Sequence, residues 1–276
     1  MKAGFGAGGT KRRPDLNSVT REPRTRARGR RRRDVGRRRR DVGAVGFVDR
    51  ASSASRDAPE MSSVSAMVIE RAEATPSEAT AKMALVAARA ALAAAGVSSE
   101  RARESGEKYA FEYRASPREM TESERDWCFE LTRRNMEAVY ARTWGWNAVE
   151  KRRELNNYAA KYVLARHVES GELVAFVHFR FEREDDDVDA PVGYVYELQC
   201  EPAHQGRALG ETLVRVVEAI SKRLGMDAVV LTVLKANVGA YGFYTKKMKY
   251  EIDALSPDAS IDKGSSHYLI LSKRFV

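Results

Sequence analysis

Hydrophobic and polar positions follow two different periods in the second half of the chain. Residues 193–201 are rich in aromatic and β-branched side chains over about the length of a strand. A helical period follows them, set by Leu209, Leu213, Val216, Val217 and Ile220. The turn between the two holds Gly206, Ala208 and Gly210. The pattern therefore predicts a strand, a turn of small residues and a helix that runs to Leu224.

Similar patterns predict the other elements. Capping boxes at Thr75–Glu78 and Thr121–Glu124 indicate helices that run to Gly96 and Tyr140. Shorter helices are expected at 150–155 and 239–247, and strands at 111–114, 161–167, 173–182, 228–233 and 268–272. The mixture predicts an α/β domain, and no internal repeat is visible.

The small-residue turn at 206–210 favours anion binding. Glycine and alanine let a ligand approach the backbone, and the N–H groups at a helix N-terminus attract negative charge. A turn of this kind also serves as a plain connection in many α/β proteins. The turn alone is thus a weak signal for a phosphate site.

Charge divides the chain unevenly. Residues 1–60 hold 18 Lys/Arg and 7 Asp/Glu, a net charge of +11, whereas the rest carries −2. Residues 1–65 show no hydrophobic period and few aromatics, so we expect a disordered basic tail. A helical segment at 66–105 should pack on the folded domain at 106–276.

The tail contains two arginine blocks, 28–33 and 37–40. They suit a nuclear import signal or a non-specific contact with nucleic acid, although a merely solvated tail is the simpler interpretation. An organelle transit peptide is less attractive because Asp15, Asp34 and Asp41 interrupt the arginines. Met61 and Met67 are candidates for alternative start sites, and the sequence does not decide between them and Met1.

Other classes of chemistry find little support in the sequence. Cys128 and Cys200 are the only cysteines, so a disulfide scaffold and a thiolate zinc site are both disfavoured. The four histidines lack metal-ligand spacing, and no G-x-S-x-G elbow is present. The alanine-rich run 83–97 is too short to span a bilayer. We expect no metal and no membrane contact.

Two motifs in order resemble the GNAT acetyltransferase family. Gln205-x-x-Ala208-x-Gly210 is similar to its pyrophosphate-binding signature, with alanine in place of the first glycine, and Asn237-x-x-Ala240-x-x-x-Tyr244 is similar to its next motif. The resemblance implies a GNAT (acyl-CoA N-acyltransferase) fold, a mixed twisted sheet flanked by helices, and acetyl-CoA as acetyl donor. The implied coenzyme-binding residues are Leu198, Cys200, Gln205, Gly206, Arg207, Ala208, Leu209, Gly210, Asn237 and Tyr244.

A longer series of residues between Trp127 and Phe275 resembles the NatD group of histone N-terminal acetyltransferases. Its most specific parts are Trp144-Gly-Trp146 and Tyr194-x-Tyr196-Glu197. The resemblance implies acetylation of an N-terminal amine on a histone tail that begins Ser-Gly-Arg-Gly. It also implies nuclear and cytoplasmic location and no obligate auxiliary subunit.

Glu197 is the candidate general base. An α-amine with a pKa near 7.7–8.0 needs only modest help to lose its proton, and one carboxylate suffices. A carboxylate within an apolar strand is costly unless it is paired or functional, so a structural salt bridge is the alternative. The NatD resemblance favours the catalytic role. Tyr244 matches a family tyrosine that can protonate the departing thiolate, and it ranks below Glu197.

Substrate contacts are expected from aromatic and acidic side chains. Aromatic walls can enclose a small first residue, although core packing explains each ring equally well. Glu182 and Glu184 alternate at a strand end, so they could face an arginine of the substrate together, whereas Asp185, Asp186 and Asp187 suit a solvated tip. The remaining implied substrate residues are Tyr140, Trp144, Glu154, Tyr194, Tyr196, Thr232 and Tyr268.

Two other functions stay open on the sequence. A GNAT enzyme could act on a lysine side chain or a small amine, which would demand a stronger base because the lysine pKa is near 10.4. A non-enzymatic nucleic-acid-binding protein would depend on the tail and would not need Glu197 or the turn.

Overall fold

Seven strands form one mixed sheet in the order β1-β2-β3-β4-β5-β7-β6. The computed structural model describes residues 63–98, 108–143, 145–184, 189–257 and 266–275, which all lie in one compact unit. The strands are β1 (Tyr109–Arg114), β2 (Lys161–His167), β3 (Leu173–Arg183), β4 (Pro191–Cys200), β5 (Ala228–Leu234), β6 (Glu251–Ile252) and β7 (Tyr268–Arg274). Strands β4 and β5 are parallel, and the other neighbours are antiparallel.

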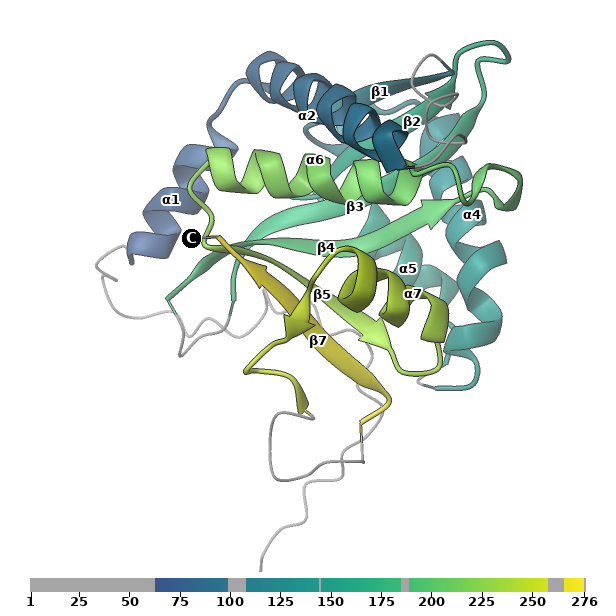
Figure 1. The fold of residues 1–276 in the computed structure, drawn as a ribbon. Coiled ribbons are helices and arrows are strands. Elements are labelled where there is room, and N and C mark those ends of the chain that lie inside the picture. The colour runs from purple at the N-terminus through teal and green to yellow at the C-terminus, as the bar shows by residue number, and fades with distance from the viewer. Residues whose placement is uncertain (1–62, 99–107, 144, 185–188, 258–265, 276) are drawn as a thin grey trace, which may run out of the picture. The chain divides into compact units, whose positions relative to one another are not determined.

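Helices cover both faces of this sheet, as predicted (Figure 1). Helix α6 (Leu209–Arg223) lies on one face with α1 (Val64–Glu73) and α2 (Ser77–Ser98), and α4 (Glu122–Tyr140) and α5 (Ala148–Leu155) lie on the other. Helix α7 (Val238–Gly242) leads into a π-helical turn, η4 (Phe243–Lys247). Short 3₁₀ turns occupy η2 (Pro117–Glu119) and η3 (Pro202–His204).

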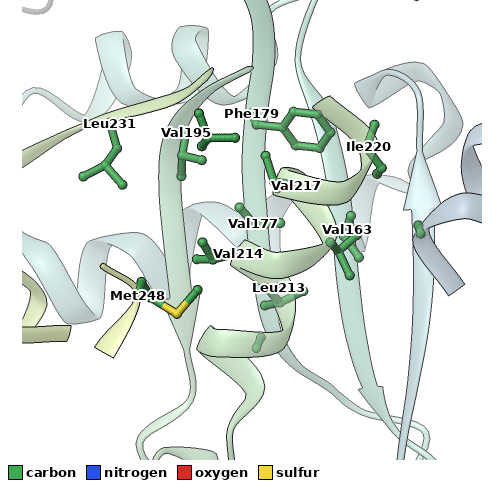
Figure 2. Packing of buried hydrophobic residues seen from close by; sticks show 14 of the residues in the cluster. Val163, Val177, Phe179, Val195, Leu213, Val214, Val217, Ile220, Leu231 and Met248 are labelled. Carbon is green, nitrogen blue, oxygen red and sulfur yellow. The ribbon is translucent and has the colours of Figure 1, made fainter. Parts of the chain in front are cut away.

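The main core lies between the sheet and α6. Figure 2 shows Leu213, Val214, Val217 and Ile220 of α6 facing side chains of β2, β3 and β4. The helical residues Leu213, Val217 and Ile220 are fully buried, as the periodicity predicts. A second cluster packs α4 and α5 against the opposite face through Leu131, Leu155 and Phe176. This second face leaves room for polar groups further along the strands.

Most predicted elements are confirmed, and two local expectations are wrong. Thr121 and Glu124 form the expected capping box at the start of α4. At Thr75, however, no capping box forms, because the hydroxyl donates to the Arg71 carbonyl at 3.1 Å and closes the preceding helix. That helix, α1, begins at Val64 within the stretch expected to be a tail. The predicted aspartate tip at 185–187 lies outside the described residues, as does most of the tail.

Helix α1 is tied to the sheet by an ion pair between a buried lysine and an exposed glutamate. The ammonium of Lys161 on β2 is 4% exposed and lies 2.7 Å from both carboxylate oxygens of Glu73. A buried ammonium is costly unless it is paired. Helix α1 therefore contributes a charge that the sheet itself needs.

Strand β4 shifts its register by one residue where the candidate base lies. Val195 pairs with Phe179, but Glu197 pairs with the adjacent His178, so Tyr196 is an extra residue on β4. Such a β-bulge turns two successive side chains to one face of the sheet. Tyr196 stacks on His178, and Glu197 contacts α4 and α5, so both lie on the α4/α5 face.

Gly193 allows α6 to lie close to β4. A Cβ atom at this position would be 2.2 Å from the Ser221 hydroxyl oxygen and 3.2 Å from its Cβ. We predict that Gly193→Ala destabilises the protein by about 1–3 kcal/mol through overpacking. Adding Ser221→Ala should recover most of this loss, because it removes the closest atom. Thermal unfolding of the single and double variants measures both effects, and additive losses would contradict the close contact.

Candidate active site

Strands β4 and β5 separate beyond Val195 and leave a cleft. Their parallel pairing covers only Val192–Val195 and Ala228–Leu231, although both strands continue. The cleft has a volume of about 540 Å³ and is bounded by α4, the end of β4, the turn before α6, and α7 with η4. It thus lies at the carboxyl ends of two parallel strands, a common place for ligands in α/β sheets.

The turn at the mouth of the cleft presents backbone N–H groups. Gly206 and Ala208 both have left-handed backbone angles, with φ of 72° and 62°, and α6 begins directly after Ala208. The first intrahelical bond runs from the Thr212 N–H to the Ala208 carbonyl. The N–H groups of Leu209, Gly210 and Glu211 therefore lack intrahelical acceptors and suit an anion such as a pyrophosphate.

Nine of the ten expected coenzyme residues line this cleft. They are Leu198, Cys200, Gln205, Gly206, Ala208, Leu209, Gly210, Asn237 and Tyr244. Arg207 is not among the lining residues, so the structure does not place it with the others. The Leu209 side chain is buried in the core, which leaves its backbone for the ligand. The Asn237 side chain also caps α7 through the Ala240 N–H at 3.1 Å.

A smaller chamber of about 80 Å³ continues from the cleft toward Glu197. The two spaces share lining residues, among them Met136, Leu198 and Tyr244. The chamber is also lined by Tyr140, Lys151, Tyr196, Glu197 and Thr232. A group bound in the cleft can therefore meet a second reactant near Glu197.

Glu197 is buried and fully engaged by neighbouring donors. It is 4% exposed. Its Oε1 accepts hydrogen bonds from Lys151 Nζ at 2.8 Å and from the Tyr140 hydroxyl at 3.3 Å. Its Oε2 accepts one from Gln199 Nε2 at 2.7 Å. The carboxylate is thus held in one orientation at the wall of the chamber.

The tyrosines around the chamber keep their protons. Burial raises the pKa of both Tyr140 and Tyr244, and the negative charge of Glu197 adds to each shift. Burial and the charge of Glu182 raise the pKa of Tyr196 in the same way. Each phenol therefore remains a hydrogen-bond donor at working pH, and Tyr244 is a candidate proton donor beside the cleft.

Three of the tyrosines expected at the substrate side, Tyr194, Tyr196 and Tyr268, lie on strands of the sheet. Tyr194 and Tyr196 lie with ring centroids 5.2 Å apart, and the Tyr194 hydroxyl bonds the Thr232 hydroxyl. Tyr268 lies on β7 opposite Leu234 and is half-buried. Trp144 lies outside the described residues, so its predicted contact with substrate stays a prediction.

The two glutamates expected to face an arginine together do not point the same way. Glu182 accepts a hydrogen bond from the Tyr196 hydroxyl at 2.6 Å, and its side chain is 28% exposed. Glu184 is 5% exposed and ion-pairs with Arg274 of β7 at 2.5 Å. The strand ends at Arg183, so strict alternation no longer fixes the direction of Glu184. Glu182 is therefore the better candidate for a substrate contact.

Sequence reasoning missed Lys151, the cation that hydrogen-bonds to Glu197. Its ammonium lies between Glu197 and Glu154, 2.7 Å from the latter. The carboxylate of Glu154, expected to contact substrate, thus faces Lys151. The spacing of Lys151 and Glu154 on one helix was visible in the sequence, but their distance from Glu197, which follows 46 residues after Lys151, hid the cluster.

Part of the chain matches a known protein family. Residues 120–250 match the sequence model of the Acetyltransferase (GNAT) family. Solved structures that resemble the chain include the PaiA N-acetyltransferase of Thermoplasma acidophilum in complex with coenzyme A, with 17% identity over 60% of this chain and 99% of that chain and a TM-score of 0.43. A second structure, Arabidopsis thaliana NAA60 in complex with a bisubstrate analogue, has 15% identity over 60% of this chain and 98% of that chain, with a TM-score of 0.44. A third, Arabidopsis thaliana Naa50 in complex with the bisubstrate analogue CoA-Ac-MVNAL, has 18% identity over 61% of this chain and 99% of that chain, with a TM-score of 0.42.

The sheet, its cleft and the small-residue turn define a coenzyme A-dependent acyltransferase. Residues 120–250 form a GNAT acetyltransferase domain, which uses acetyl-CoA as donor. The described ranges contain no group of three or more His, Cys, Asp or Glu that could hold a metal ion. Within the same ranges, no helix is long and apolar enough to cross a membrane.

Ala208 offers a test of the turn. A non-glycine residue in the left-handed region costs about 1–2 kcal/mol, whereas glycine loses roughly 0.5–1 kcal/mol through unfolded-state entropy. We predict that Ala208→Gly raises Tm by up to about 4 °C and changes the KM for acetyl-CoA, because this residue lines the cleft.

Lys249 provides the matched control, since it also has a positive φ, 63°, but is exposed and does not line the cleft. Lys249→Gly should raise Tm similarly and leave the KM for acetyl-CoA unchanged. A change in KM with Lys249→Gly, or none with Ala208→Gly, would argue against the turn as the coenzyme site.

Proposed function

We propose that this protein acetylates the α-amino group of protein N-termini, with a histone tail beginning Ser-Gly-Arg-Gly as the preferred substrate class. The observation that supports this most is the buried Glu197 carboxylate, which lies at the wall of a narrow chamber continuous with the coenzyme cleft. Tyr196 and Glu197 of the NatD-like run Tyr194-x-Tyr196-Glu197 line this chamber. The expected nuclear and cytoplasmic location and a delivery role for the basic tail belong to the same proposal.

The cleft residues fit the coenzyme. The N–H groups at the start of α6 suit its pyrophosphate, and the end of β4, no longer paired with β5, offers backbone groups for an extended chain. Bound acetyl-CoA supplies the acetyl group as a thioester. Lys247, which lines the cleft and pairs with Glu211 at 2.9 Å, adds positive charge near the same place.

The chamber residues then act on the amine. Glu197 takes the proton that the α-ammonium must lose before its nitrogen can act as a nucleophile, directly or through a water. Tyr140 and Tyr196 bound the chamber, and its small volume favours a small first residue. Tyr244, which stays protonated, lines the junction of cleft and chamber and is placed to donate a proton there.

Glu197→Gln tests the base. The amide keeps the shape and loses the basicity, so turnover near pH 7 should fall by on the order of 10²–10⁴-fold. The residual rate should recover as the pH rises past the α-amine pKa of about 8, when the neutral amine forms without help. Initial rates across this pH range measure both effects. Tyr244→Phe should also slow turnover but show no recovery at high pH.

Turnover of Glu197→Gln close to that of the wild-type enzyme near pH 7 would show that the carboxylate has a structural role. A loss that stays constant at high pH would argue against proton removal as the step that Glu197 assists. Thermal unfolding with and without acetyl-CoA checks that the fold and the coenzyme site remain intact.

Peptide assays test the substrate class. A Ser-Gly-Arg-Gly peptide should be acetylated, the same peptide with a blocked α-amine should not, and replacement of its arginine by alanine should lower kcat/KM. Glu182→Ala should reduce this arginine preference, because a charge-assisted bond of this kind contributes about 1.5–3 kcal/mol when it is partly shielded. High salt should reduce the preference in part.

Glu184→Ala is the matched comparison on the same segment. Because Glu184 is buried and pairs with the exposed Arg274, we expect lower stability and an unchanged preference for arginine. Acetylation of the blocked peptide on a lysine would instead favour a lysine acetyltransferase. An arginine preference that is equal in Glu182→Ala and wild type would remove Glu182 from the substrate site.

A further inference from the structure

A cation is buried at the inner wall of the chamber, in contact with the candidate base. The Lys151 side chain is 12% exposed, and its Nζ lies 2.8 Å from Glu197 and 2.7 Å from Glu154. It also lies 5.3 Å from the centre of the Tyr140 ring. One ammonium thus bridges two carboxylates beside the place where the substrate amine must lose its proton.

The protein holds this lysine on a fixed element. Arg180 of β3 donates to the Glu154 carbonyl at 2.8 Å, and the Tyr162 hydroxyl of β2 donates to the Leu155 carbonyl. Both bonds fasten the C-terminal end of α5 to the sheet, while Asn147 caps its N-terminus. Lys151, in the middle of α5, therefore has little freedom to leave Glu197.

The ionisable groups around Glu197 and Glu154 come from several elements, and Lys151 is the cation among them that lies against both carboxylates. From α5, Lys151 and Glu154 face Glu197; from α4 and η4, the phenols of Tyr140 and Tyr244 remain neutral because burial raises the pKa of each. From β3, burial lowers the pKa of His178 well below its ordinary value, so this ring is neutral, and Arg180 lies over the Tyr196 ring beside Glu182. Lys151 is thus the cation that directly contacts both buried carboxylates.

The ionisation of the cluster agrees with this arrangement. Burial alone lowers the pKa of Lys151, but the charges of Glu197 and Glu154 outweigh it and raise the pKa well above its ordinary value. Burial raises the pKa of Glu154, and the positive charge of Lys151 opposes that rise. Without Lys151, the two carboxylates would repel each other with no cation between them, and one would retain a proton.

We infer that Lys151 is a positioning residue for acetyl transfer: its ammonium holds the Glu197 carboxylate in place, keeps the neighbouring Glu154 ionised and makes the site favour a neutral amine. This inference rests on the proposed function. The proton that leaves the α-ammonium moves to the Glu197 carboxylate, and Lys151 stays protonated throughout. Its positive charge repels an ammonium and tolerates a neutral amine, so it also assists the loss of that proton.

Lys151→Met tests the inference through the pH dependence of kcat/KM for the Ser-Gly-Arg-Gly peptide. We expect the acid limb to move up by about one pH unit or more, because the carboxylate pair then holds one proton. The loss should appear in kcat, with no rise in the KM for the peptide, and activity should approach that of the wild type at high pH. Adding Glu154→Gln should return the limb toward its original position, and Lys151→Arg should keep the limb in place.

An activity-independent measurement separates this inference from the proposed function. Carboxyl ¹³C resonances of labelled glutamates in the free enzyme report the protonation of Glu197 and Glu154, with Glu197→Gln and Glu154→Gln assigning the signals. We expect the titration midpoint of the pair to rise by about one pH unit or more in Lys151→Met. If wild-type enzyme fails to acetylate the peptide, the proposed function fails, while this titration still decides the role of Lys151.

A purely structural ion pair would give a different result. In that case Lys151→Met would lower kcat/KM by the same factor at every pH, and the carboxyl titration would not move. Either result overturns the inference. If Lys151→Met fails to fold, the double variant Lys151→Met/Glu154→Gln replaces it, because the second substitution removes the uncompensated charge. This double variant is compared with Glu154→Gln alone. An acid limb at the same pH in both variants contradicts the inference equally.

Discussion

The site depends on two adjacent changes in the pairing of strand β4. At Val195 the strand ends its parallel pairing with β5, and one residue later it bulges against β3. The first change opens the cleft between the strands. The second turns Tyr196 and Glu197 toward the same face, where strict alternation would have directed Glu197 into the apolar core beneath α6. The coenzyme space and the orientation of the base thus have a common structural origin.

The face of the sheet beneath α4 and α5 changes from apolar to charged along β3. Phe176 packs in the second core, His178 stacks between Tyr162 and Tyr196, and Arg180 and Glu182 follow at the same alternate positions. Buried polar groups generally need partners. Arg180 and Glu182 find hydrogen-bond partners in α5 and β4, whereas the ring nitrogens of His178 have none. The polar end of this face lies against Tyr196, which lines the chamber. The opposite face is mainly apolar, apart from Lys161, which pairs with Glu73. The stability of the domain and the chemistry of the site are therefore largely carried by different faces.

Much of the fold could be predicted because local patterns determine it. The helical period of α6 and the capping box at Thr121 correspond to observed elements within a residue or two. The capping box at Thr75 failed because the same residue types can also close a preceding helix. The site was predictable only where one segment carries it, as in the turn that ends at Gly210. The cluster of Lys151 with Glu197, and the pairing of Glu184 with Arg274, join residues far apart in sequence. No single-sequence period reports such pairs.

The ion pair between Lys161 and Glu73 shows that the folded domain extends further toward the N-terminus than the family match. The family match begins at residue 120, yet a strand inside that match depends on a carboxylate from a helix that ends almost fifty residues earlier. Strand β1, which also precedes the match, pairs with β2 from Tyr162 to His167. The region that is shared with relatives and the region that folds as one cooperative unit therefore have different borders. Substitutions in α1, which is remote from any catalytic group, would alter the abundance of the folded enzyme rather than its chemistry.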